Sequence, residues 1–223
     1  MKQAEFRCKR IRLEEIWDFA ESVRNDHWAA GELPVNVEAI VEFKLKLDIE
    51  PEHGLMQSTD MEAYLRSDLT GIIVDHDHYM DEKFAKRMRF SFAHELGHFF
   101  LHKDFYSKVI FESAEEWREI LLGLPEPDYT YFEYQANEFA GRLLVPRKAL
   151  IHEIGTAMET LKRNNLLEHI KSDSYAVLSA ISTRIGKTFG VSSEVIEKRV
   201  EREKLWPPDI CEKAMQKSEK NRQ

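Results

Sequence analysis

The stretch from His94 to His98 reads His-Glu-Leu-Gly-His, which is an H-E-x-x-H motif. On a helix, side chains four residues apart lie on one face, with Cβ atoms about 5–6 Å apart. His94 and His98 can therefore bind one zinc ion, and Glu95 can act as the base toward a water that the ion activates. A motif this short also occurs by chance, so the flanking sequence must supply the rest of the site.

The motif lacks one ligand, because a catalytic zinc ion usually has three protein ligands and one open position. Glu133 is the best candidate. Asn137 follows it four residues later on the same helical face, where its side chain can hydrogen-bond the far nitrogen of one histidine and fix its tautomer. Asp104 has the spacing of a metzincin-like ligand, but Leu101 replaces the glycine that such a turn requires. Glu138 is a third candidate, although it should face away from Glu133.

Two further roles around the metal remain open. His102 lies four residues after His98 and eight residues after His94. Eight residues of helix rise about 12 Å, so His102 cannot join the same tetrahedral site. We expect it to support a ligand or to pack in the core. Peptide hydrolysis also needs a donor to the oxyanion. The sequence does not choose among the candidates for this donor, which are His102, Tyr129, Tyr131 and Tyr134. Zinc is the expected ion, and manganese or iron would also suit two histidines and a glutamate.

Hydrophobic periodicity predicts the elements that position these residues. Helices are expected at Leu13–Trp28, at Val37–Leu47 with Asn36 as cap, from Asp81 through the motif, from Ser113 to Leu122, and from Asp128 to Leu144. Residues 63–65 and 71–75 have strand character and predict a small antiparallel unit. An extended peptide could add to the edge formed by Gly71–Val74. The fold class is thus α+β and predominantly helical.

The C-terminal part of the chain reads as helical from Arg147 onward. Within it, Ser179–Lys204 has the layout of a helix-turn-helix, with a break near Gly190 and a cap at Ser192 or Ser193. We therefore expect a domain of residues 1–150, which carries the metal site, and a helical subdomain of residues 151–223.

A second group of potential ligands follows the predicted strand, where Asp75–His78 reads Asp-His-Asp-His. Aspartate and histidine are common metal ligands. However, the two residue types alternate along the segment, and no residue nearby in the sequence completes a set of ligands. The favoured interpretation is a polar loop that leaves the strand.

The composition excludes some classes of function. Of the 223 residues, 43% are hydrophobic and 32% charged, which is typical of a soluble globular protein. The formal net charge of −8 disfavours indiscriminate binding to nucleic acid or to anionic membranes. Only two cysteines are present, Cys8 and Cys211, and no apolar run resembles a signal peptide or a membrane span. These features predict a cytoplasmic protein with reduced thiols.

Two blocks of sequence resemble the ImmA/IrrE-type metallopeptidases. Residues Arg89–His102 contain the H-E-x-x-H motif in its family context, and Glu133–Pro146 matches the pattern E-x-x-A-N-x-F-A-x-x-L-L-x-P. The resemblance implies a zincin-like fold with a gluzincin-style site, in which His94, His98 and Glu133 bind zinc and Glu95 is catalytic. It also implies site-specific cleavage of a helix-turn-helix repressor of the Xre type, which derepresses genes of mobile elements or of a stress response.

Two other functions remain as alternatives. The protein could be a DNA-binding regulator that acts through Ser179–Lys204, although the basic and acidic residues there nearly balance and direct binding to nucleic acid is not expected. It could also be a metal-binding regulator or an antitoxin-like protein that binds its partner without cutting it. Glu95 favours catalysis, because a purely structural zinc site needs no general base. The oligomeric state is not predicted, and a C-terminal sensor domain like that of some family members is not expected in the residues after Lys204.

Overall fold

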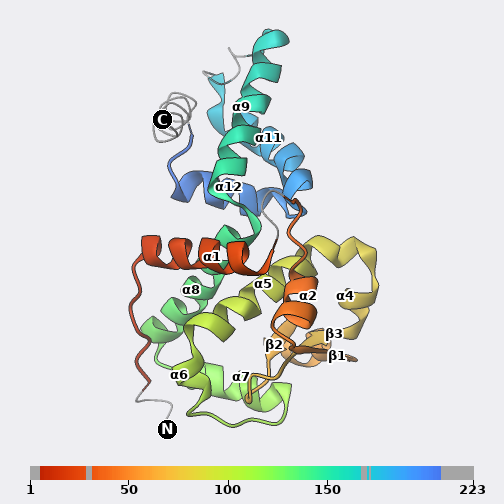
Figure 1. Cartoon of the computed structure of the whole chain (residues 1–223), viewed down its shortest axis with the longest axis vertical. Coiled ribbons are helices and arrows are strands. Elements are labelled where there is room, and N and C mark those ends of the chain that lie inside the picture. Colours follow the sequence, from red (N-terminus) through yellow and green to blue (C-terminus); the bar gives the residue numbers. More distant parts are fainter. Residues whose placement is uncertain (1–5, 29–31, 167–169, 171, 207–223) are drawn as a thin grey trace. The chain divides into compact units, whose positions relative to one another are not determined.

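The computed structural model of the chain describes residues 6–28, 32–166, 170 and 172–206 (Figure 1). These residues form two compact units, which divide between Leu143 and Leu144. Cys8 is a buried free thiol, whereas Cys211 and the charged tail after it lie outside the described residues. No helix in the described part of the chain is long and apolar enough to cross a membrane.

The first unit is mainly helical, as predicted, and carries one small sheet. Its helices are α1 (Leu13–His27), α2 (Val37–Ala39), α3 (Leu55–Thr59), α4 (His76–Met80), α5 (Ala85–Leu101), α6 (Lys103–Tyr106), α7 (Ala114–Leu122) and α8 (Glu126–Leu144). A π-helical turn, Ile40–Lys44, continues α2, and a 3-10 turn, Glu82–Phe84, precedes α5. The strands are β1 (Asp48–Glu52), β2 (Ala63–Leu65) and β3 (Gly71–Asp75).

The sheet is mixed, with the order β1-β3-β2, and not purely antiparallel as expected. The predicted antiparallel pairing of β2 with β3 is present, and Tyr64 lies opposite Ile73. The strand that the prediction missed is β1, which pairs in parallel with β3. Its sequence, Asp-Ile-Glu-Pro-Glu, is acidic and contains a proline, and an edge strand tolerates both.

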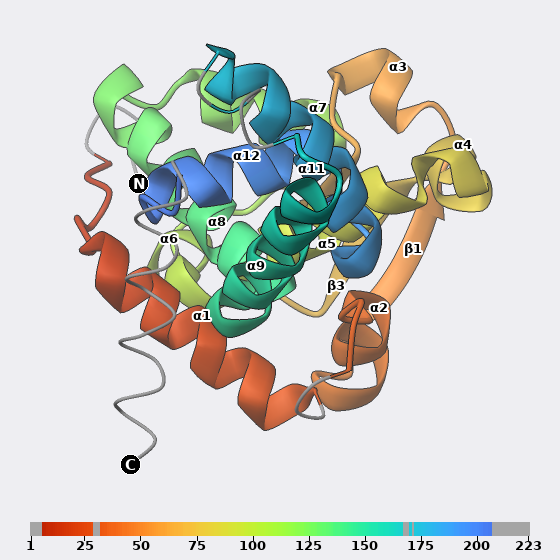
Figure 2. The same cartoon turned by 90° about the horizontal axis from the view of Figure 1, so that it is seen from above.

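The strand order also corrects the expected site for an added peptide strand. Since β3 is paired on both sides, the edge predicted at Gly71–Val74 is occupied. The free edge beside the motif helix belongs to β2. Strand β1 forms the opposite edge of the sheet, and in Figure 2 its arrow ends beside α4.

The core of the first unit forms around α5 and α8, the two helices that carry the predicted site. Their inward side chains include Phe92, Leu96, Phe132, Ala136 and Phe139, all of which are fully buried. Burial of each phenylalanine or leucine contributes about 1.5–3 kcal/mol relative to an exposed position. The helices approach closely at Gly97, where an added Cβ would lie 2.8 Å from the Cα of Ala136. The glycine of the motif therefore sets the separation of the two helices.

Several predicted caps are present, and one is wrong. The side chain of Asn36 accepts a hydrogen bond from the backbone N–H of Ala39, and Ser113 accepts one from Glu116. Asp81 caps the 3-10 turn before α5. Asp128 is not a cap, because α8 already begins at Glu126. Its carboxylate instead accepts a hydrogen bond from the backbone N–H of Cys8, at 3.0 Å.

The second unit contains α9 (Arg147–Arg163), α11 (Ser174–Phe189) and α12 (Ser193–Arg202). The last two pack together as the predicted helix-turn-helix-like pair. Gly190 ends α11 with a positive φ of 62°, which favours glycine, and Ser192 caps α12 by accepting a hydrogen bond from Val195. At Gly186 an added Cβ would lie 2.8 Å from the carbonyl oxygen of Val191, so this turn is also tightly packed.

Candidate metal centre

The motif helix α5 presents two faces, and the difference between them places the histidines. Met88, Phe92 and Leu96 recur at helical spacing and fill the core. His94 and His98 lie on another face, toward α8, with side-chain exposures of 17% and 3%. Helix α8 faces them with Glu133, whose side chain is 27% exposed. Two helices of the core thus bring together residues that are 35 positions or more apart in the chain.

The three predicted ligands converge on one point. His94 Nε2 lies 3.0 Å from His98 Nε2 and 3.2 Å from Glu133 Oε2, and His98 Nε2 lies 3.7 Å from Glu133 Oε1. Ligands of a tetrahedral zinc ion, each about 2.0–2.1 Å from the metal, are about 3.3 Å from one another. The three separations bracket this value, so the residues fit the ion that the motif predicts.

Hydrogen bonds fix the tautomer of His94. The amide nitrogen of Asn137 donates to the carbonyl oxygen of Glu133 at 2.9 Å, so the amide oxygen is the atom that faces His94 Nδ1, at 3.2 Å. Nδ1 must then carry the proton, and Nε2 presents its lone pair to the metal position. Asn137 therefore lies where the sequence places an orienting residue.

A longer chain of hydrogen bonds fixes the tautomer of His98. Gln135 Nε2 donates to the carbonyl oxygen of Lys9 at 2.7 Å, which leaves Gln135 Oε1 to accept from His102 Nε2 at 2.9 Å. His102 Nδ1 must then be an acceptor, and it lies 2.9 Å from His98 Nδ1. His98 thus donates from Nδ1 and keeps the lone pair of Nε2 for the metal.

His98 and His102 are held neutral, as their hydrogen-bond pattern requires, whereas the hydrogen bond and charge of Glu133 raise the pKa of His94 against the effect of burial. Burial lowers the pKa of His102 to about 4, and it lowers the pKa of His98 as well. Sequence reasoning missed Gln135 and Lys9. The available signal was a glutamine on the apolar face of α8, since a buried amide needs partners.

Glu95 is buried next to the ligands and opens onto the same pocket. Burial raises the pKa of its carboxyl to about 8, and the charge of Glu133 adds to this, while His94 and the backbone N–H of Leu65 act in the opposite direction. A divalent cation at the ligands would lower the pKa again. A carboxyl in this position is placed to accept and return a proton.

The pocket in front of the ligands has a volume of about 310 Å³. It lies between α5, α7, α8 and the start of β2, and its walls carry apolar and charged side chains. Besides the three ligands and Glu95, the residues that line it include Glu62, Ala63, Phe90, Trp117, Leu121 and Tyr129.

The other candidates lie elsewhere. Asp104 is exposed on α6, and Glu138 is buried with its carboxylate accepting a hydrogen bond from Trp17 Nε1 at 3.0 Å. His102 lies behind His98 as described above. Of the three tyrosines considered as oxyanion donors, Tyr129 lines the pocket, whereas Tyr131 and Tyr134 contact each other with ring centroids 5.5 Å apart and are not among the pocket residues.

A family model supplies the identification. The model described as the IrrE N-terminal-like domain, which represents a peptidase family, matches residues 78–201, more than half of the chain. The chain belongs to this family. The predicted resemblance is therefore confirmed, and the match runs from α4 through α5 and α8 to α12.

Membership in the IrrE N-terminal-like family gives this chain a metallopeptidase-type function, which implies a protein or peptide substrate and a bound metal ion, typically zinc. Comparisons with curated proteins and with solved structures give no match.

Proposed function

We propose that this protein is a zinc-dependent endopeptidase in which His94, His98 and Glu133 bind the metal. The observation that carries the proposal is the convergence of three donor atoms, 3.0–3.7 Å apart, at a pocket that also contains a buried carboxylate. Both histidines have their Nε2 lone pairs free for the metal, because hydrogen bonds at Nδ1 hold the protons there.

A zinc ion at these ligands would lower the pKa of a water molecule and polarise the carbonyl of the scissile peptide bond. Glu95 takes up the proton from the attacking water and passes it to the leaving amine. Tyr129 is the donor that we propose for the oxyanion, since it is the tyrosine that shares the pocket with Glu133. His102 acts through His98 by holding its tautomer.

The peptide substrate is proposed to lie along the free edge of β2. The backbone hydrogen bonds of Glu62 with Asp75 and of Arg66 with Gly71 mark the hydrogen-bonded pairs of this ladder. Because such pairs alternate, the N–H and C=O groups of Ala63 and Leu65 point away from β3. Leu65 N–H is used by Glu95, while Ala63 lines the pocket. Ala63 is therefore the residue that can pair with an extended substrate.

The substrate that we propose is a helix-turn-helix repressor of the Xre type in the cytoplasm, whose cleavage derepresses mobile-element or stress-response genes. This finer assignment rests on the resemblance of the blocks Arg89–His102 and Glu133–Pro146 to ImmA/IrrE-type proteins. A pocket of about 310 Å³ that is partly charged suits a narrow choice of sequence better than general proteolysis.

The test is incubation of the purified protein with a co-encoded helix-turn-helix repressor, followed by gel electrophoresis and mass spectrometry. We expect one defined cleavage, which a chelator abolishes and added zinc restores. Glu95→Gln should retain zinc and lose cleavage by about 10²–10⁴-fold, the typical contribution of a general base. Cleavage that survives chelation, or that Glu95→Gln performs at the parent rate, would refute the mechanism.

The DNA-binding alternative has less support. Lys198 on α12 pairs with Glu194 at 2.8 Å, and Arg199 is buried and pairs with Glu203. Arg199 is therefore not presented to phosphates, and the exposed Lys198 has an acidic neighbour that offsets its charge. The non-cleaving alternative does not account for a carboxylate at the position of Glu95.

A further inference from the structure

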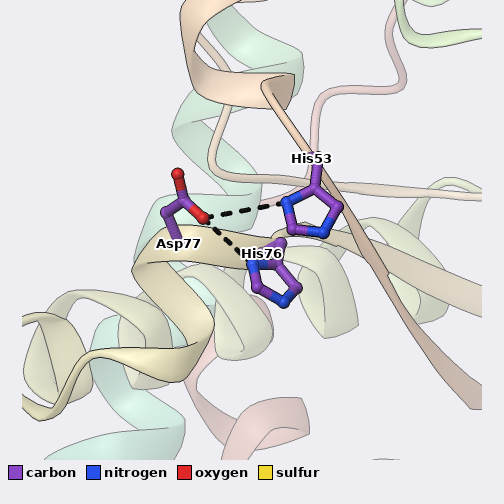
Figure 3. Close-up of side chains that lie close together, drawn as sticks. All are labelled: His53, His76 and Asp77. Carbon is purple, nitrogen blue, oxygen red and sulfur yellow. Dashed lines mark hydrogen bonds and ion pairs between the residues drawn. The ribbon is translucent and has the colours of Figure 1, made fainter.

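A second cluster of potential ligands lies at the ends of the two parallel strands. In the register of β1 and β3, Glu52 lies opposite Asp75. The next residues along the two strands are His53 and His76, so the parallel pairing puts these histidines side by side. Asp77 follows on the first turn of α4, and Figure 3 shows its carboxylate pointing toward both rings.

The side chains converge on one carboxylate oxygen. Asp77 Oδ1 lies 3.0 Å from His76 Nδ1 and 3.8 Å from His53 Nδ1, and the two ring centroids are 3.7 Å apart. One donor atom from each residue lies within 4.8 Å of the others. The two measured separations bracket the value of about 3.3 Å expected for tetrahedral ligands, as they do at the candidate active site. A small movement of exposed side chains would complete the geometry.

The backbone that carries the cluster is held in place. The buried carboxylate of Asp75 accepts hydrogen bonds from the backbone N–H of His78 in α4 and of Met56 in α3, both at 2.9 Å. These bonds tie the first turn of α4 to the turn that follows His53. A metal would therefore have to order only the ligand side chains and not a loop.

The donor set indicates the class of ion. Two imidazoles and a carboxylate suit zinc, copper or nickel, whereas magnesium and calcium prefer oxygen ligands. The side chains of His53 and Asp77 are 75% and 78% exposed, so a bound ion would keep open positions for water. The net charge of −8 favours a cation near the surface.

We propose that His53, His76 and Asp77 form a second binding site for a divalent ion of the zinc type. The ion fastens the ends of β1 and β3 to α4. This site shares no ligand with the candidate active site, and the proposal does not depend on proteolysis.

The test compares zinc binding by the full chain and by His53→Gln after chelation and dialysis, with elemental analysis at a fixed free zinc concentration. The variant should bind one equivalent less than the parent, whatever the occupancy of the active site. His152→Gln, which removes an exposed histidine of α9, is the matched control and should bind as the parent does. A parent and a His53→Gln variant with equal zinc content would overturn the proposal.

A second measurement identifies the atoms. In a proton–nitrogen correlation spectrum of the histidine rings, zinc should shift Nδ1 of His53 and His76, whereas at the candidate active site it should shift Nε2 of His94 and His98. Asp77→Asn should remove the Nδ1 shifts and leave the Nε2 shifts. Zinc that leaves both Nδ1 signals unmoved, or that moves them equally in Asp77→Asn, would also overturn the site.

Discussion

The close contact at Gly97 leads to a specific prediction about metal affinity. In Gly97→Ala the new Cβ would lie 2.8 Å from the Cα of Ala136 and 2.9 Å from its carbonyl oxygen. Nonbonded carbon atoms in favourable van der Waals contact are about 3.5–4.0 Å apart. Helices α5 and α8 must therefore separate by roughly 0.7 Å or remain together under strain. Because α5 carries His94 and His98 and α8 carries Glu133, the same movement opens the metal site.

The magnitude follows from the cost of overpacking, which is about 1–3 kcal/mol. Alanine is favoured over glycine in a helix by about 1 kcal/mol, so the net loss in the free energy of unfolding should be only about 0–2 kcal/mol. Metal binding requires the closed arrangement, since ligand distances tolerate only about 0.2 Å. If zinc binding forces the two helices into the closed arrangement, it must overcome this strain of about 1–3 kcal/mol. The zinc affinity then falls about 5- to 150-fold.

The assay is competition for zinc against a fluorescent chelator, together with urea unfolding of each variant. Gly186→Ala is the matched control, because its Cβ would meet the carbonyl oxygen of Val191 at the same 2.8 Å, within the second unit. It should lose stability without losing zinc affinity. The reasoning is refuted if folded Gly97→Ala binds zinc like the parent, or if Gly186→Ala weakens binding equally.

Three other outcomes are expected. Asn137→Ala should weaken zinc binding about 10- to 100-fold in the same competition assay, because His94 loses the acceptor that holds its tautomer; unchanged affinity would contradict this role. Chelation should lower the melting temperature in calorimetry, and zinc should restore it in proportion to the logarithm of its free concentration; a melting temperature that does not respond to zinc would argue against a bound ion. Burial raises the pKa of the Cys8 thiol from about 9 to about 11, so its contribution to stability is present below pH 9 and is lost as the pH rises toward 11. Between pH 9 and pH 11, the free energy of unfolding measured with urea should therefore fall faster with pH for the parent than for Cys8→Ala. The difference between the two slopes should be at most about 1.4 kcal/mol per pH unit, and equal slopes would contradict the buried thiol.

The sequence predicted those parts of the fold and site that depend on local spacing. The four-residue spacing of His94 and His98, and of Glu133 and Asn137, fixes which side chains share a helical face. The helix boundaries near Leu13, Ser113 and Ser192 follow from caps and periodicity in the same way. These local patterns do not predict that α5 and α8 pack against each other. In the structure they do, and the histidines of α5 face Glu133 and Asn137 of α8.

The features that were missed depend on contacts distant in sequence. The sequence of strand β1 does not predict a strand, because it contains Pro51 and three acidic residues, which are uncommon in strands. Without β1 nothing indicates that His53 lies beside His76, so the group at Asp75–His78 read as a polar loop. Gln135 could not be given a role without Lys9, its partner 126 residues away. Asp128 resembled a cap because its type fits one, although its partner is the backbone of Cys8.

The long span between Lys9 and Gln135 also bears on when the protein becomes active during its synthesis. A nascent chain exposes His94 and His98 well before Glu133, so it offers an ion two imidazoles and no carboxylate from α8. The carbonyl of Lys9 leaves the ribosome early, but it has no partner until Gln135 follows. The proposed metal site, and the proposed peptidase activity with it, can therefore form only after most of the first unit has been translated.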